Sequence, residues 1–474
     1  MLPRLNRLRP KPTTYLFGAA IVLCIVMVLP SCVYIYLQHE HTHFILGLQY
    51  CVIIIFSLSS FFVLWESVAA LFSRAPSASD AEVEAMLANG VTAIIAAYLP
   101  NESEIIADTL RHFLLELQNP HGNLQIILAY NSPQSLEVED DLRALEEMDS
   151  RLFVLNVHGS TSKAENVNAA LNFADGGIVG VFDADHLPAA DVFCRAAQWI
   201  SAGWDMVQGR CVIRNASLNL LTRLIAVEFN TIYAVSHQGR FNITGTAVFG
   251  GSNGYWRTSV IKTLGFDNSM LTEDIDLSVR ALLAGRKLAH DSSIISTELA
   301  PVRGIHWLSQ RKRWAQGWFE VTLKHGLAIL KSHELSYFQR VAWLYLLPWR
   351  EVYPTLGTQF FPLMACSIVT GSSLFWFSTP FTAATTTLNL ACAPMIVLIT
   401  YLNARRLPGN FSGFWYLPYA AGALVYTTAK TLVSLIAQVA HFTRDTAWVT
   451  TPRYSLNPIV NVSPQSPTAN TDRT

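Results

Sequence analysis

The sequence predicts an α/β domain with a mostly parallel sheet, inserted between α-helical transmembrane segments. Three observations lead to this fold class. Of the 474 residues, 51% are hydrophobic and only 14% are charged, whereas soluble proteins average roughly 25% charged residues. Long uncharged runs lie toward both ends of the chain, and predicted strands alternate with predicted helices between them. The net charge of −1 gives no reason to expect a nucleic-acid partner.

Two apolar runs near the N-terminus predict a transmembrane hairpin within residues 1–73. Residues 1–12 carry four basic residues and no acidic one, and uncharged runs follow from Thr13 to Leu37 and from Phe44 to Trp65. Each run is long enough to cross a bilayer, which takes about 20 residues. Because basic ends stay in the cytoplasm, the hairpin returns the chain to that side. The His39–His43 loop is either a metal-binding loop or, as we favour, a polar loop at the membrane surface.

Residues 74–325 have the composition of a soluble domain. The predicted strands are residues 91–98, 124–130, 152–158, 178–182, 206–214 and 246–256. The predicted helices are residues 102–117, 136–148, 163–173, 218–235 and 275–283. This alternation indicates a mostly parallel sheet covered by helices on both faces. The segment has neither a G-x-G-x-x-G fingerprint nor a P-loop pattern, which argues against a Rossmann dehydrogenase and a P-loop ATPase.

Two carboxylates follow the apolar run Ile178–Phe182. Asp183 and Asp185 stand one residue apart at the carboxyl end of a predicted strand, where open α/β sheets bind their ligands. Together they can share one divalent cation through oxygen ligands. The alternative is a solvated turn, in which Asp is common.

Two further polar clusters occur later in the same domain. Thr272 is a good helix N-cap, and the helix dipole alone can explain Glu273 and Asp274 in the first turn. Residues 310–318 are dense in basic residues and tryptophans. They form either a membrane-surface helix or a surface that offers Arg313 to a diphosphate and a tryptophan to a sugar ring.

Apolar sequence returns after residue 325. Interfacial helices are predicted over residues 326–350, where Ser336–Arg350 is amphipathic, and transmembrane helices over residues 351–441. The 53 residues from Val352 to Ala404 are uncharged and suffice for two spans with a turn near Pro380. With a further span within residues 411–440, the chain has five spans, or six if the amphipathic segment also crosses.

The seven cysteines form no C-x-x-C pair, and five of them lie in apolar runs. This distribution argues against a disulfide framework or a zinc site. We expect the cysteines to act as small buried apolar residues.

The three polar clusters occur in a fixed order that resembles the processive family 2 glycosyltransferases, which include cellulose, chitin and hyaluronan synthases. The matching motifs are Asp183-x-Asp185, Thr272-Glu273-Asp274 and Gln310-x-x-Arg313-Trp314. Weaker matches are residues 162–168, 249–252 and 448–453, and the last of these resembles a gating segment. Good resemblance extends over residues 91–318. It implies a GT-A fold and an inverting sugar transfer from a UDP- or GDP-linked donor to a growing β-linked polysaccharide, with or without its translocation.

The resemblance also implies a role for each site residue. The leaving diphosphate needs a divalent cation, Mg²⁺ or Mn²⁺, and basic groups, and the attacking hydroxyl needs a general base. The implied metal ligands are Asp183 and Asp185, and the implied donor-binding residues are Tyr98, Glu102, Lys163, Asp183 and Arg313. The implied base is Asp274, with Glu273 as the second catalytic acid, and the implied acceptor-binding residues are Gly251, Ser252, Gln310 and Trp314.

Two departures leave the donor open. Ala96-Ala97-Tyr98 replaces the family's Pro-Thr-Tyr turn, and Asn131 stands where the family has an acid that meets the base or ribose. An uncharged amide does not fix the nucleobase, so neither UDP nor GDP is preferred.

Three other functions compete with the polysaccharide synthase. A glycolipid-forming transferase, similar to ceramide glucosyltransferase, would add one sugar to a lipid acceptor. A channel or transporter would carry intramembrane ionisable residues, but these are few, Lys430 being the clearest. The Gln-x-x-Arg-Trp motif disfavours a dolichol-type transferase. We therefore predict a multi-pass protein of the plasma membrane, with a cytoplasmic catalytic domain and a gating-like segment and disordered tail over residues 442–474.

Overall fold

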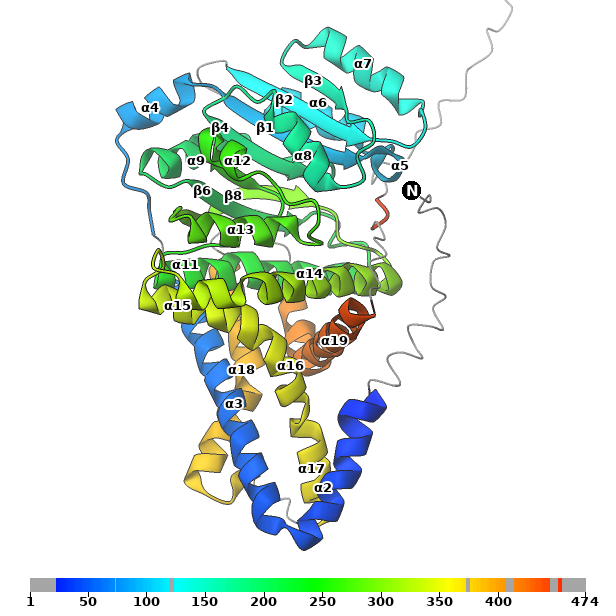
Figure 1. Cartoon of the computed structure of the whole chain (residues 1–474), viewed down its shortest axis with the longest axis vertical. Helices are drawn as coiled ribbons and strands as arrows, with labels where there is room; N and C mark the ends of the chain where they lie inside the picture. Colours follow the sequence, from blue (N-terminus) through cyan, green and yellow to red (C-terminus); the bar gives the residue numbers. More distant parts are fainter. Residues whose placement is uncertain are drawn as a thin grey trace, which may run out of the picture.

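An eight-stranded mixed sheet forms the centre of the upper domain (Figure 1). The computed structural model describes residues 23–72, 74–118, 123–371, 376–405, 413–443 and 451–453. The strands are β1 (Val91–Tyr98), β2 (Leu124–Asn131), β3 (Leu152–Asn156), β4 (Ile178–Asp183), β5 (Leu187–Pro188), β6 (Met206–Ile213), β7 (Gly254–Arg257) and β8 (Leu288–Glu298). Their spatial order is β3-β2-β1-β4-β7-β6-β8-β5.

The first four strands in this order run parallel, as predicted. Strand β7 then runs antiparallel to both β4 and β6, whereas β6 and β8 are parallel and β5 is antiparallel to β8. Strands β1 and β4 are almost wholly buried apolar runs, as expected of strands covered on both faces. Ala96 pairs with Asp183, so the carboxyl ends of β1 and β4 meet at one edge of the sheet.

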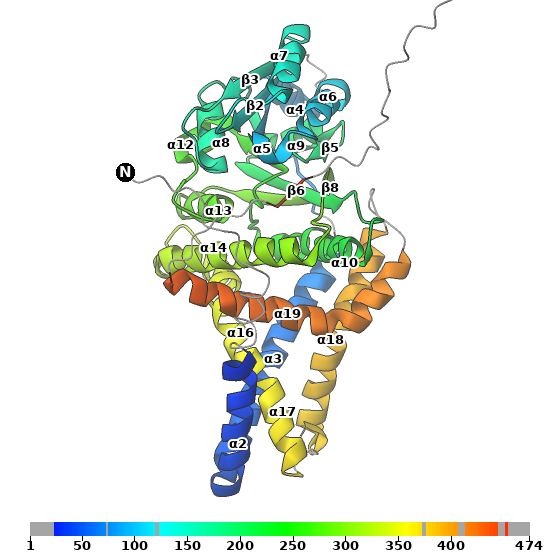
Figure 2. The same cartoon turned by 90° about the vertical axis from the view of Figure 1, so that its right-hand side faces the viewer.

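Helices pack on both faces of this sheet (Figures 1 and 2). They are α4 (Asp80–Ala88), α5 (Leu99–Glu102), α6 (Ile106–Glu116), α7 (Val138–Met148), α8 (Lys163–Leu171), α9 (Val192–Ser201), α10 (Leu220–Phe229), α11 (Gln238–Thr244), α12 (Thr258–Leu264) and α13 (Glu273–Leu283). The α/β sheet covered by helices on both faces, as predicted from the sequence, is confirmed.

Two predicted elements differ from the structure. The helix expected over residues 218–235 continues as far as Thr244, because a π-helical segment, η2 (Asn230–His237), joins α10 to α11. The strand expected over residues 246–256 is wrong, since only β7 is extended. Gly251 and Asn253 have positive φ angles of 85° and 53°, so the chain turns there and cannot form a regular strand.

Long apolar helices extend away from the sheet domain (Figure 1). Within the described residues, three are long and apolar enough to cross a membrane: α3 (Thr42–Ala69), the run Tyr337–Val369 and α18 (Pro380–Ala404). The run comprises α15 (Tyr337–Leu344), η3 (Tyr345–Trp349), α16 (Arg350–Thr358) and α17 (Phe360–Val369). The segment predicted as interfacial is thus continuous with the next apolar helix.

Two further apolar segments are shorter or bent. Helix α2 (Leu29–Glu40) follows η1 (Cys24–Val28), and the rest of the first predicted span lies outside the described residues. The segment from η5 (Gly413–Trp415) through α19 (Tyr416–Phe442) bends by 61°.

Helices α14 (Gly304–Lys331) and α19 lie across the junction between the sheet domain and the apolar helices (Figure 2). The two helices contact each other along their length. This junction contains residues 310–318, the third polar cluster of the sequence. The cluster therefore lies beside both the sheet edge and the apolar helices.

Candidate active site

Every predicted site residue lines a single cavity of about 1510 Å³. The cavity begins at the carboxyl edge of β1 and β4 and continues to residues of the apolar helices α3, α16, α18 and α19. Its central polar groups come from three segments far apart in the sequence: the end of β4, the start of α13 and the N-terminal half of α14. The fold thus brings together the clusters that the sequence singled out.

One end of the cavity is built around Asp183 and Lys163. Asp183 ends β4, and Lys163 begins α8 directly after its N-cap, Ser162. The Lys163 ammonium forms an ion pair with Asp183 and donates a hydrogen bond of 2.5 Å to the Gly251 carbonyl. Although burial opposes ionisation of both groups, their pairing raises the pKa of Lys163 and lowers that of Asp183. The pair remains charged at neutral pH and faces the cavity.

Asp185 is buried and already has partners. Its Oδ2 accepts a hydrogen bond of 3.0 Å from the Leu299 backbone N–H. The same oxygen forms an ion pair with the Arg453 guanidinium at 3.1 Å. Arg453 belongs to the predicted gating-like segment, of which residues 448–450 lie outside the described part of the chain. The described end of that segment therefore reaches the same end of the cavity.

His186 is a candidate metal ligand that the sequence reasoning missed. Ligand atoms of Asp183, Asp185 and His186 all lie within 4.8 Å of one another. Two carboxylates and an imidazole are a donor set that suits Mn²⁺ and related divalent ions. The position of His186 directly after Asp185 was the available signal.

Glu102 and Tyr98 close the turn after β1. Glu102 accepts hydrogen bonds from the Tyr98 backbone N–H at 2.8 Å and from Asn101 at 2.6 Å. Burial raises the pKa of Glu102 to about 7. Both residues line the cavity, and the geometry shows that Glu102 shapes this turn.

Asp274 lies at the start of α13 and faces the middle of the cavity. Its Oδ1 accepts a hydrogen bond of 2.9 Å from the Ile275 backbone N–H. Burial, followed by the neighbouring Glu273 carboxylate, raises the pKa of Asp274 to about 7. Burial also raises the pKa of Glu273. A carboxylate that titrates near neutrality has the property required of a general base.

Gly251 permits a close backbone approach to Asp274. A Cβ atom at this position would lie 2.8 Å from Asp274 Oδ2, and its φ of +85° disfavours any L side chain. We expect Gly251→Ala to displace the Asp274 carboxylate and to lower the rate of the sugar transfer that the sequence predicts. The matched control is Gly203→Ala, because Gly203 has a similar φ of +86° but no atom within 4 Å of its added Cβ. Both variants should lose a similar backbone contribution of about 1 kcal/mol, measured by thermal unfolding, while only Gly251→Ala should lose most of its activity. Equal activity of the two variants would contradict the close approach.

Helix α14 presents the third cluster to the cavity. Arg313 forms no ion pair or hydrogen bond with any residue in the described ranges, and its Nε is buried without a partner. Burial lowers its pKa while the carboxylates of Glu273 and Asp183 oppose that shift. The Gln310 Oε1 is also buried without a partner. These groups are available to a ligand.

The contact between α13 and α14 depends on Gly317. A Cβ atom there would lie 2.4 Å from Thr272 Cγ2, so only glycine lets the two helices approach this closely. On the other side of the contact, Asp276 is fully buried and binds Lys324 at 2.7 Å and His325 at 2.8 Å. Asp276 thus has a structural role, although it shares the acidic cluster with Asp274.

A second arginine of α14 has a different role. Arg311 is buried and forms an ion pair of 2.6 Å with Glu228 of α10. Glu228 also accepts hydrogen bonds from Tyr426 at 2.6 Å and Lys430 at 2.7 Å, both on α19. The Arg311 guanidinium lies 4.3 Å from the ring centre of Trp314. Sequence reasoning missed Glu228, which pairs with Lys430, the intramembrane ionisable residue that the sequence singled out.

Residues 178–406 match the family model described as "Glycosyl transferase family group 2". This region of the chain, just under half of its length, is therefore similar to that glycosyltransferase family. It contains the Asp183, Asp274 and Arg313 clusters, whereas Lys163 and the first three strands precede it.

The same region is similar to two curated relatives. "Probable glucomannan 4-beta-mannosyltransferase 7" of Oryza sativa subsp. japonica is 27% identical over 250 residues, covering 50% of this chain and 40% of the relative. "Poly-beta-1,6-N-acetyl-D-glucosamine synthase" of Staphylococcus epidermidis is 27% identical over 269 residues, covering 54% of this chain and 63% of the relative. The match therefore spans about half the length of these proteins.

The glycosyltransferase fold is also shared with a solved structure. The "Mannosyltransferase PcManGT from Pyrobaculum calidifontis in complex with GDP-Man and Mn2+" superposes with a TM-score of 0.50 and 18% identity, covering 83% of this chain and 98% of that chain. The similarity supports the GT-A-like fold.

Proposed function

We propose that the protein is an inverting, metal-dependent hexosyltransferase that extends a β-linked polysaccharide from a nucleotide-sugar donor. One observation carries the proposal: a single cavity joins Asp274 and Arg313 to the apolar helices. The names of both relatives describe enzymes of β-linked glycans, which agrees with this assignment.

The donor would bind at the end of the cavity formed by Asp183 and Lys163. Asp183, Asp185 and His186 would hold the divalent cation, which neutralises charge that develops on the leaving diphosphate. Lys163 and Arg313 would supply fixed positive charge to the same phosphates. Arg313 suits this role because it has no partner among the described residues, so donor binding does not require an existing ion pair to break.

Asp274 would act as the general base. Its carboxylate takes the proton from the attacking acceptor hydroxyl, whose oxygen bonds to the anomeric carbon as the bond to the diphosphate oxygen breaks. A single displacement inverts the configuration, so an α-linked donor gives a β-linked product. The Trp314 ring and the Gln310 amide would hold the terminal acceptor sugar, beside the Gly251–Ser252 turn.

The acceptor would extend from this site toward the apolar helices. That part of the cavity is lined by hydroxyl, amide and aromatic side chains, including Ser59, Ser60, Trp349, Tyr353 and Asn389. Such a mixture suits a sugar chain, which needs both hydrogen bonds and flat apolar surfaces. We further propose that the protein is a multi-pass protein of the plasma membrane, with the sheet domain in the cytoplasm and the predicted domain boundaries. A lipid acceptor entering from the same helices is the second candidate, since the cavity reaches them.

Product size distinguishes these functions. Purified full-length protein is incubated with radiolabelled UDP- and GDP-sugars, and the label is separated into polymer and chloroform-soluble fractions. We expect label in a high-molecular-mass, β-glycosidase-sensitive product. One sugar on a chloroform-soluble acceptor would replace the polymer proposal with the glycolipid function, and no transfer from either donor class would overturn both.

Removal of divalent cations should abolish this transfer. A chelator takes away the cation that Asp183, Asp185 and His186 would hold, so we expect loss of activity and its recovery on addition of Mn²⁺ or Mg²⁺. Activity is measured as label incorporated per minute, with the chelator–metal complex added as a control. Full activity in excess chelator would exclude the metal-dependent mechanism.

A further inference from the structure

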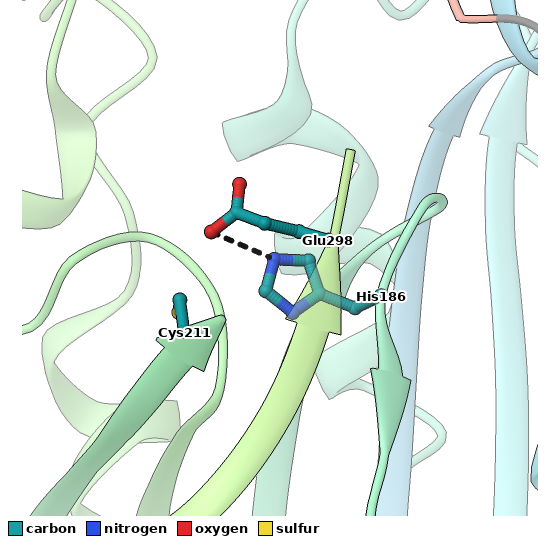
Figure 3. A group of neighbouring side chains, drawn as sticks. All are labelled: His186, Cys211 and Glu298. Carbon is teal, nitrogen blue, oxygen red and sulfur yellow. Dashed lines mark ion pairs between the residues drawn. The ribbon is translucent and has the colours of Figure 1, made fainter. Parts of the chain in front are cut away.

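A cluster of three metal-ligating side chains lies beside the donor end of the cavity (Figure 3). His186 follows β4, Cys211 lies on β6 and Glu298 ends β8, and their ligand atoms lie within 4.8 Å of one another. The three side chains point toward a common centre in Figure 3. Because β6 and β8 are adjacent strands, the sheet itself brings Cys211 and Glu298 together.

Burial and charge make this cluster unusual. The side chains of His186 and Cys211 are each about 1% exposed, and the Glu298 side chain is 14% exposed. Among the described residues, no lysine or arginine lies within ion-pair distance of Glu298, whose only such partner is His186 Nε2 at 3.9 Å. Asp183 and Asp185 stand nearby and each already has a basic partner. Arg453 and Arg214 also act on Glu298 electrostatically, but neither lies within ion-pair distance of it. A buried carboxylate without such a direct partner is a favourable ligand for a cation.

The imidazole is held in an orientation that suits metal binding. His186 Nδ1 lies 2.9 Å from Ser296 Oγ, and Ser296 pairs with Cys211 across β6 and β8. Such a second hydrogen bond typically fixes the tautomer and the direction of a ligating histidine. It leaves Nε2 facing Glu298.

We propose that His186, Cys211 and Glu298 form a second cation site that selects a thiophilic ion such as Zn²⁺ over Mg²⁺. A nitrogen, sulfur and oxygen donor set suits Zn²⁺, whereas Mg²⁺ prefers oxygen ligands. Zinc bonds of about 2.0–2.1 Å to nitrogen and oxygen place tetrahedral ligands roughly 3.4 Å apart. The His186–Glu298 separation of 3.9 Å therefore has to shorten only slightly. Binding converts the Cys211 thiol to a thiolate and releases its proton to solvent.

The second cation site shares His186 with the proposed donor metal site of Asp183, Asp185 and His186. The other ligands of the two sites differ. Since Nδ1 is engaged by Ser296, one ring nitrogen remains, and it can ligate only one ion at a time. Three protein ligands leave the fourth zinc position open to the cavity that all three residues line.

Cobalt substitution tests the site without any sugar transfer. Purified full-length protein, free of nucleotide, is titrated with Co²⁺, because a cobalt–thiolate bond gives a charge-transfer band in the near ultraviolet. We expect this band in the wild type and its loss on addition of Zn²⁺ but not of excess Mg²⁺. No thiolate band in the wild type would overturn the proposal.

Five variants assign the band to the cluster. Cys211→Ala and Glu298→Gln should lose or strongly weaken it, and Cys211→Ser provides a near-isosteric replacement if Cys211→Ala does not fold. Cys392→Ala removes a buried cysteine elsewhere and should retain the band, as should Asp183→Asn, which alters only the donor group. A band that survives Cys211→Ala or Cys211→Ser, or that disappears in Asp183→Asn, would overturn the second site. Neither result bears on whether the protein transfers sugar.

Discussion

Replacement of Asp274 by Asn is expected to lower the rate of sugar transfer by about 10²–10⁴-fold, the usual contribution of a general base. The amide keeps the shape of the side chain but cannot accept the proton of the acceptor hydroxyl. Donor binding should persist, because the proposed phosphate and metal contacts lie on Asp183, Lys163 and Arg313. The turnover number is measured with labelled donor, and donor affinity by titration calorimetry with the free nucleotide.

The pH dependence gives a second readout of the same group. Since the pKa of Asp274 is raised to about 7, the wild-type rate should rise with pH through that value as the carboxylate ionises. The residual rate of Asp274→Asn should lack this step. The control is Asp108→Asn, which alters an exposed acid of α6 that pairs with Arg111. Retained turnover, or an unchanged pH profile, would remove Asp274 as the base.

Substitution of Arg313 by Ala is expected to reduce transfer by about 10²–10³-fold, as for the loss of one charge-stabilising donor, without loss of stability. Arg313 has no ion pair or hydrogen bond among the described residues, so its removal breaks no such interaction and takes away a partly buried charge. We expect the melting temperature to stay the same or to rise. Transfer rate and thermal unfolding are measured on the same preparations.

Arg311→Ala provides the matched control two residues away. Arg311 is paired with buried Glu228, and removal of one partner of a buried pair typically costs about 3–5 kcal/mol. The cost should fall toward the lower limit, because Tyr426 and Lys430 still contact Glu228. Arg311→Ala should therefore melt at a lower temperature than Arg313→Ala. A destabilised Arg313→Ala with normal activity would assign Arg313 to the structure and not to the site.

The local elements were predictable because their signals are local. Strand β1 was predicted with its observed limits, and β4 to within one residue, since apolar runs bounded by polar residues determine both. The segment 246–256 was misread because its apolar pattern resembles a strand, while its geometry is set by backbone angles at Gly251 and Asn253. Sequence patterns report side-chain burial more directly than they report such angles.

The roles within the clusters were harder to predict. Arg311 and Arg313 stand in the same basic stretch. Arg311 is structural because it pairs with Glu228, which lies 83 residues before it in the sequence, whereas Arg313 has no such partner among the described residues and can meet a ligand. His186, Cys211 and Glu298 come from three separate segments, and their proximity depends on the order of β6 and β8 in the sheet. The spacing of the cysteines gave no sign of this metal-binding cluster, because the other two ligands of the cluster, His186 and Glu298, are not cysteines and are distant from Cys211 in the sequence.

Because of the close contact between Gly317 and Thr272, we expect the proposed reaction to be sensitive to a residue that has no functional group. Thr272 precedes Glu273 and Asp274, and Gly317 lies one turn beyond Arg313 on the same rigid helix. This contact therefore sets the distance between Asp274, the proposed base, and Arg313, which is proposed to contact the leaving group. Any side chain at position 317 would push α14 away from the start of α13. This shift would lengthen the distance between Asp274 and Arg313 and would move Trp314 and Gln310 away from Asp274 together. Proton abstraction, stabilisation of the leaving group and alignment of the acceptor would therefore all depend on this one contact. We expect a side chain at position 317 to impair all three together.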